Sequence, residues 1–173
     1  MSEPIRRRSL LLMAAAVPLG ACAQKPSVPP PGSGMSASVT YLHLLAKTPF
    51  FAALSTDQLQ WVIDHSREWS VVPGAEIASS TRGVDSFWVL LDGGWQVESG
   101  GRSVKAGRAD PAKWYGGRDM SALALGDTRV VATAKSYVMQ IQQSDLDDML
   151  RRRFAFGAHL ESGMAFYRSL LRQ

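Results

Sequence analysis

Cysteine and histidine are scarce in this 173-residue chain, and both shortages exclude a class of site. Cys22 is the only cysteine, so no disulfide can form within the chain and no cysteine cluster can hold a metal. The three histidines are scattered without the spacing of metal ligands: His43, His65 and His159. We therefore expect no metal site and no bound cofactor.

Net charge is also low for a protein that binds nucleic acid. The formal value is +4, and residues 1–21 carry three arginines and one glutamate, so removing that segment would leave +2. Only Arg172 and Gln173 follow the last helix that the sequence predicts, so we expect no DNA-reading element after it. The sequence therefore predicts no nucleic-acid partner.

An apolar run long enough to cross a bilayer, which takes about 20 residues, is missing too. Residues 9–17 form a shorter apolar run, which Arg6, Arg7 and Arg8 precede and small residues follow. This order is typical of a secretory signal peptide, which we expect at residues 1–21. A buried helix is the alternative, but the basic flank and the proline-rich continuation disfavour it.

The signal segment ends in Leu19-Gly20-Ala21-Cys22, which resembles the lipobox of bacterial lipoprotein precursors. In those precursors the cysteine is acylated and becomes the new N-terminus, so the resemblance implies a lipid anchor at Cys22. An unmodified buried cysteine is the alternative. Ala23 is not the aspartate that retains some lipoproteins in the inner membrane, so we expect the periplasmic face of the outer membrane. Arg7-Arg8 also resembles a twin-arginine signal, which leaves the export route open.

Proline, glycine and serine dominate residues 23–38, which predicts that residues 22–38 comprise the lipidated cysteine and a linker. Sixteen residues in polyproline II geometry reach at most about 50 Å. We expect this tether to hold one folded domain, residues 39–173, away from a lipid surface.

The stretch 85–98 has the clearest strand pattern. Residues 87–91 are all apolar, which suits a strand covered on both faces, and Trp95 and Val97 then alternate with polar residues. Gly93-Gly94 between the two runs predicts a hairpin, because glycine accepts positive φ. Other strand-like runs occupy residues 69–72, 75–79, 102–105, 130–134 and 137–142. Many short strands with glycine-rich turns predict a sandwich or jelly-roll barrel.

Helical patterns flank these strands. A short helix is expected at residues 40–45, and Ser55 with Gln58 predicts a capping box before the next helix. Ser144 is expected to cap a third helix, and the apolar spacing over residues 154–171 predicts a fourth. The fold class is therefore mainly β with N-terminal and C-terminal helices.

Three strings of the domain resemble the effector domain of the cyclic nucleotide-binding family, found in catabolite-activator-type regulators and kinase regulatory subunits. They are PGAEI at 73–77, GVDSFWVLLDG at 83–93 and WQV at 95–97. The resemblance covers about residues 41–171 and implies a β-roll barrel with a C-terminal helix packed over its mouth. In the family these strings build the barrel and do not bind the nucleotide.

The resemblance also implies where a ligand would bind. In the family a Phe-Gly-Glu string opens a short helix whose N-terminal amides face the cyclic phosphate, the glutamate binds the ribose, and an arginine about ten residues later pairs with the phosphate. Here Arg129 lies at that distance and Asp119 can replace the glutamate. The other candidate ligand-binding residues are Gly116, Gly117, Met120 and Ser121.

This cassette departs from the family pattern. If Tyr115-Gly116 is aligned with Phe-Gly, Gly117 stands at the glutamate position and the ribose contact is missing. A surface ion pair or solvated loop charges are the alternative for Arg129 and Asp119. Trp88, Trp114 and Tyr115 could stack on a base, although aromatic residues at strand ends more often belong to the core.

Two functions remain open from the sequence. One is a non-enzymatic envelope lipoprotein that senses a cyclic nucleotide or another small anion. The other is a degenerate domain that no longer binds nucleotide and acts by protein contact, which the scarcity of cyclic nucleotides outside the inner membrane favours. An enzyme is not expected, because the sequence shows no nucleophile–base pair, no paired carboxylates and no P-loop or dinucleotide fingerprint.

Overall fold

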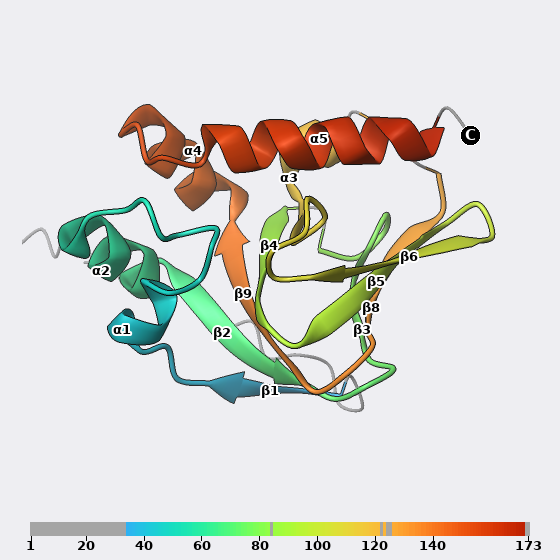
Figure 1. Cartoon of the computed structure of the whole chain (residues 1–173), viewed down its shortest axis with the longest axis horizontal. Helices are drawn as coiled ribbons and strands as arrows, with labels where there is room; N and C mark the ends of the chain where they lie inside the picture. Colours follow the sequence, from blue (N-terminus) through green and yellow to red (C-terminus); the bar gives the residue numbers. More distant parts are fainter. Residues whose placement is uncertain (1–33, 84, 122, 124–125, 172–173) are drawn as a thin grey trace, which may run out of the picture.

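The computed structural model describes residues 34–83, 85–121, 123 and 126–171, so the expected signal segment and Cys22 lie outside the described residues. Within that part the chain forms two antiparallel sheets that close on each other as a β-roll, with helices at its ends and along one side (Figure 1). The mainly β fold with flanking helices is confirmed. Among the described residues, no helix is both long enough and apolar enough to cross a membrane.

One sheet has five strands and the other has four. The five-stranded sheet has the order β1 (Met35–Ser38), β2 (Ser66–Val71), β9 (Ser136–Gln142), β4 (Ser86–Asp92) and β7 (Trp114–Gly116). The four-stranded sheet has the order β3 (Glu76–Ser79), β8 (Thr128–Ala132), β5 (Gly94–Ser99) and β6 (Arg102–Gly107). All neighbouring strands are antiparallel. Most strands that are consecutive in the sequence belong to different sheets, so the chain repeatedly crosses between the sheets, as in a jelly roll.

The hairpin predicted at Gly93-Gly94 is wrong, because β4 and β5 belong to different sheets. This turn instead carries the chain from one sheet to the other, and the crossing from β8 to β9 lies against it. The Ser136 hydroxyl accepts from the Gly94 N–H at 3.1 Å. Gly93 has φ 85°, and a Cβ there would lie 2.6 Å from the Lys135 carbonyl oxygen, so only glycine fits where the two crossings meet. The hairpin of this region is β5–β6.

The linker interpretation is wrong for Met35–Ser38, which form β1. This strand pairs with β2 along its whole length, from Met35 opposite Val71 to Ser38 opposite Glu68. The Val72 N–H also donates to the Gly34 carbonyl at 2.9 Å. The proline-rich composition hid the change, because these four residues carry no strand pattern of their own and gain their geometry from the edge of β2.

The helices expected from the sequence are present, but several of their ends differ. They are α1 (Leu42–Leu45), α2 (Thr56–Asp64), α3 (Gly117–Ser121), α4 (Gln143–Arg151) and α5 (Gly157–Leu171). The capping box of Ser55 and Gln58 is confirmed at the start of α2. Ser144 is not the cap of α4, because the N-cap position is Gln142, two residues earlier. The last helix begins at Gly157, three residues later than predicted.

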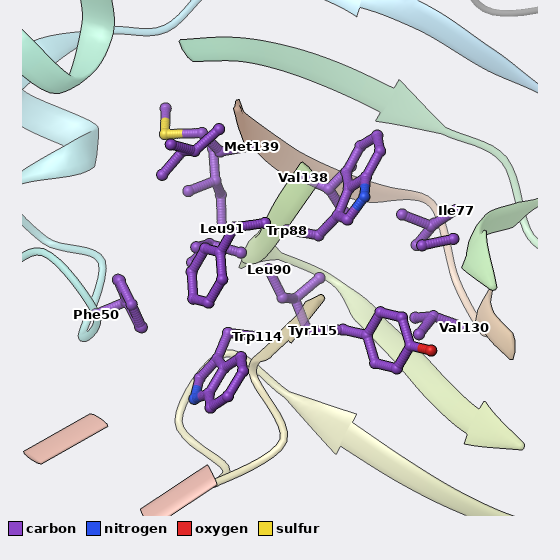
Figure 2. Packing of buried hydrophobic residues seen from close by; sticks show 14 of the residues in the cluster. Phe50, Ile77, Trp88, Leu90, Leu91, Trp114, Tyr115, Val130, Val138 and Met139 are labelled. Carbon is purple, nitrogen blue, oxygen red and sulfur yellow. The ribbon is translucent and has the colours of Figure 1, made fainter. Parts of the chain in front are cut away.

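Strand β4 runs through the core and is buried on both faces, as predicted for residues 87–91. Successive strand side chains point to opposite faces, so Trp88 and Leu90 face the inside of the barrel. Phe87 and Val89 face the helical side, where Phe87 lies 5.7 Å from the Phe50 ring. Figure 2 shows side chains of this core, contributed by strands of both sheets and by the segment before α2.

Candidate functional site

The candidate cassette begins where β7 leads into α3. Gly116 and Gly117 both have positive φ, at 100° and 77°. A Cβ on Gly116 would overlap the carbonyl oxygen of Ser86 on β4, so this turn lies directly against the neighbouring strand. Met120 is buried, and the Ser121 hydroxyl donates back to the Gly117 carbonyl at 3.3 Å. The two glycines and these two side chains therefore build the turn and the short helix themselves.

The polar groups of α3 contact α4. The Arg118 N–H donates to Gln143 Oε1 at 2.8 Å, and the Arg118 guanidinium pairs with Asp147 Oδ2 at 3.0 Å. Gln143 Nε2 in turn donates to Asp147 Oδ1 at 2.7 Å. An N–H at the start of this helix, where the family pattern places the phosphate, thus already has a side-chain acceptor. Asp119 belongs to α3, and its side chain lies outside what the structure describes.

Arg129 lies on the outer face of the four-stranded sheet. Its neighbours on β8, Thr128 and Val130, are buried, whereas the Arg129 side chain is 59% exposed. The register places Arg129 opposite Glu98 on β5, and the Arg129 Nε donates to Glu98 Oε2. This hydrogen bond, with a second from Gln96, holds the pKa of Glu98 below its usual value. The structure therefore gives Arg129 the surface ion pair that the sequence left as the alternative.

The hollow beside Arg129 is polar and carries more acid than base. It has a volume of about 620 Å³, and its charged lining residues are Glu76, Glu98, Asp127, Arg102 and Arg129. None of the described residues of α3 lines it. Three carboxylates against two guanidinium groups do not create the positive potential that a phosphate needs. Among the described residues, Arg129 thus lines this hollow without α3, and the lining of the hollow has no excess of positive charge.

Aromatic side chains fill the inside of the barrel. Trp88 lies opposite Tyr115 in the ladder, and Trp95 on the facing sheet is fully buried, with its indole N–H donating to the Ala112 carbonyl at 2.8 Å. Burial raises the pKa of Tyr115 to about 12. The Trp88 indole N–H is buried without an acceptor among the described residues. Trp88, Trp114 and Tyr115 are thus core residues, the alternative that the sequence analysis favoured.

Two hydrogen bonds and a close approach to Trp114 hold α5 on the outer side of β7. The sequence did not predict these contacts. The Tyr167 hydroxyl donates to the Trp114 carbonyl at 2.6 Å, and the Trp114 indole N–H donates to the His159 carbonyl at 2.9 Å. Gly163 faces the same indole, where a Cβ would lie 2.7 Å from Cζ2 and closer still to Nε1. The helical spacing of the apolar residues indicated the buried face of α5 but gave no partner for it.

His159 lies at the start of α5 in a partly buried position. Its ring stacks on Phe50 with 5.2 Å between centroids. Burial and the nearby Lys113 ammonium lower the pKa of His159, which a hydrogen bond to the Pro49 backbone opposes. Lys113 is itself buried, which lowers its pKa, and its ammonium donates to the Asp110 carbonyl at 3.3 Å. In the described part of the chain, no group of three or more metal-binding side chains is present.

No protein-family model and no curated protein match this chain. Solved structures do match its fold. The cAMP-bound PfPKA-R matches with TM-score 0.60 and 16% identity, over 76% of this chain and 45% of that one. The sensor domain of the transcriptional regulator DNR from Pseudomonas aeruginosa matches with TM-score 0.51 and 16% identity, over 73% of this chain and 91% of that one. A regulatory subunit of a cAMP-independent protein kinase A from Trypanosoma brucei matches with TM-score 0.51 and 20% identity, over 76% of this chain and 50% of that one.

These similarities show a fold of the cyclic nucleotide-binding type, as the resemblance of the strand strings implied. The chain spans less than half of PfPKA-R, the match with the highest of these scores. At identities of 20% or below, the likeness concerns the fold alone. The lipid anchor and any ligand stay predictions.

Proposed function

We propose that this chain is a non-enzymatic lipoprotein of the cell envelope whose cyclic nucleotide-binding-like domain acts by contact with another protein. The observation that carries the proposal is the Arg129–Glu98 pair on the outer face of the four-stranded sheet. To bind a phosphate inside the barrel, Arg129 would have to turn to the other face of β8. A one-residue slip of the strand would do this, but it would also expose Val130.

Two further observations support this choice. The first amide of α3 after Gly117 and the Arg118 side chain are already bound to α4, so the cassette offers a phosphate fewer donors than the family pattern requires. The fold also occurs in a protein kinase A regulatory subunit described as cAMP-independent. Independence of cyclic AMP is therefore compatible with a fold of this type.

Sensing of a cyclic nucleotide is the second candidate. The similarity to cAMP-bound PfPKA-R favours it, and so does the buried Trp88 N–H, a donor inside the barrel that finds no acceptor among the described residues. A ligand carbonyl or ring nitrogen could accept from it. Against this candidate stands the outward direction of Arg129.

A calorimetric titration separates the two candidates. The full chain, purified in detergent, is titrated with cyclic AMP and cyclic GMP up to about 1 mM, a range that detects binding free energies of about −4 kcal/mol or stronger. We expect no heat beyond dilution. Saturable binding would reject the contact module and favour the sensor. In that case Arg129→Ala and Arg118→Ala would show which guanidinium, if either, carries the phosphate.

The anchor is tested separately on the mature protein. We expect mass spectrometry to find acyl chains on Cys22, with the protein in the outer-membrane fraction and Cys22→Ala unlipidated. Each buried CH₂ contributes about 0.8 kcal/mol, so two or more chains anchor a protein stably where a single chain does not. An unmodified Cys22 in the mature protein would reject the lipoprotein assignment.

A further inference from the structure

Most of the exposed large apolar side chains among the described residues lie at the two ends of the edge strand β1. The described residues contain five of them, and four either follow β1 or lie beside its start: Val39, Tyr41, Leu44 and Val72. We name these four the β1–α1 face. The fifth, Leu150, belongs to α4, which lies with α5 at the opposite end of the molecule from β1 (Figure 1). Because single exposed apolar residues are normal and clusters are not, this distribution calls for a partner.

More than half of the surface of several side chains of this face is exposed and available to a partner. Val39 is 67% exposed, Tyr41 56% and Leu44 54%. Next to them lies an apolar groove of about 490 Å³, which Tyr41, Leu44 and Tyr137 help to line. The groove also has two cations, Lys47 and Arg108, and two carboxylates, Glu68 and Asp92. The charges balance, so a partner would be held by apolar contact and not by its charge.

The tether enters the domain at this same face. A Cβ on Gly34 would lie 2.7 Å from Val72 Cγ2, so the first described residue contacts Val72 at the start of β1, one strand length from Val39, Tyr41 and Leu44. Because β1 takes up Met35–Ser38, only eleven residues, 23–33, separate Gly34 from Cys22. Their reach is at most about 34 Å, and a coil of that length averages about 18 Å end to end. An anchor at Cys22 would therefore keep the β1–α1 face, and not the α4–α5 end, near the bilayer.

We propose that the β1–α1 face lies on the lipid bilayer in which Cys22 is anchored, with Tyr41 and Leu44 inserted at the headgroup level. This inference rests on the lipid anchor of the proposed function. Tyrosine suits that level, because its ring is apolar and its hydroxyl stays hydrated. The insertion can be weak, because the anchor makes it an intramolecular step at high effective concentration.

The size of the face favours a bilayer over a second copy of the chain. A stable dimer buries about 800 Å² on each partner, whereas four partly exposed side chains offer on the order of a few hundred Å². A bilayer needs no complementary shape. The domain would then have a fixed orientation, with the α4–α5 end and the four-stranded sheet directed away from the lipid and open to a protein partner.

The test uses the full chain reconstituted into phosphatidylcholine vesicles through its own anchor. An acylated Cys22 leaves no free thiol, so Leu44→Cys and Leu150→Cys can each carry one fluorescent label, both at exposed leucines of helices. Lipids with a nitroxide near the headgroup serve as quencher. We expect several-fold stronger quenching at position 44 than at 150, unchanged by salt or by anionic lipid.

A second pair of variants separates insertion from mere proximity to the tether. A label at Val39→Cys should be quenched, and adding Tyr41→Ser with Leu44→Ser should remove most of that quenching while circular dichroism stays the same. Quenching at position 39 that survives both substitutions would overturn the inference.

The remaining outcomes are distinct. Protein that floats with the vesicles but is quenched equally at 44 and 150 would overturn the inference and leave the anchor intact. Cross-links between two copies through position 44, without quenching, would assign the face to a dimer and also overturn it. Protein that does not float with the vesicles would reject the anchor, and the inference with it.

Discussion

The outer faces of the two sheets differ in what covers them. On the five-stranded sheet, Phe87 and Val89 of β4 lie under helices and the segment before α2, and β4 is apolar on both faces. On the four-stranded sheet, Gln96, Glu98 and Arg129 share an outer face that reaches solvent. A strand with helical cover must be apolar throughout, whereas a strand without it alternates. The charged Arg129 side chain is therefore suited to the uncovered, solvent-facing side of its sheet. This position makes it the partner of a surface ion pair and separates it from a phosphate inside the barrel.

The largest effect should come from truncating the covered face. Phe87→Ala removes a side chain that is 1% exposed and lies 5.1 Å from the Trp114 ring and 5.7 Å from Phe50. We expect it to lower the free energy of unfolding by about 3–5 kcal/mol, measured by urea denaturation. The control is Val131→Ala on the outer face of β8, which should cost less than about 1 kcal/mol. Equal losses of unfolding free energy in the two variants would show that the covered and the uncovered face contribute equally to stability.

The second prediction concerns the helix that provides the cover. Gly163→Ala places a Cβ against the Trp114 indole, so α5 must shift and strain the hydrogen bonds from Trp114 and Tyr167. We expect a loss of about 1–3 kcal/mol, although alanine is the better helix former. Gly157→Ala in the same helix is the matched control, since a Cβ there meets nothing within 4 Å. A stabilised Gly163→Ala variant would show that α5 does not contact Trp114 this closely.

The third prediction uses His159, which the covered side partly buries. Burial lowers its pKa in the folded state, so between that pKa and the ordinary value of about 6.5 the folded protein binds fewer protons than the unfolded one. Stability should therefore fall as the pH drops below about 6.5 and level off once the folded protein also protonates. His159→Gln should show a flatter pH profile of the unfolding free energy than the wild type.

Local patterns predicted three of the five strands of the covered sheet, β2, β9 and β4, but not β1 or β7. The all-apolar run 87–91 and the capping box at Ser55 are patterns of residues close in sequence, and both predictions are confirmed. The crossing at Gly93-Gly94 and strand β1 were missed because both depend on pairing between distant segments. A glycine pair looks the same in a hairpin and in a crossing between sheets, and β1 is a strand only because β2 offers it an edge.

The candidate site was harder to predict for the same reason. Spacing along the chain placed Arg129 at the family-like distance, but the direction of its side chain depends on the register of β8 against β5. Glu98 lies 31 residues away, so no local pattern connects it with Arg129. The acceptors of the Arg118 groups, Gln143 and Asp147, lie 25 and 29 residues away on α4. Only the folded barrel reveals that these arginines already have partners.

The smallest loss of unfolding free energy should come from a substitution on the uncovered face of the four-stranded sheet. Because Arg129 is 59% exposed, its pair with Glu98 is screened by water, and Arg129→Ala should cost only about 0.2–1 kcal/mol. The coupling is measured by a double-mutant cycle of Arg129→Ala and Glu98→Gln.

The pair should also respond to acid and salt. Glu98 has a lowered pKa in the folded state, so its contribution is present above the ordinary value of 4.5 and is lost as the pH falls through the folded pKa. The coupling should therefore weaken in acid and at high salt. A coupling of several kcal/mol that ignored salt would mean that Arg129 is held in a water-excluded site. Such a result would remove the main reason for separating Arg129 from a phosphate ligand.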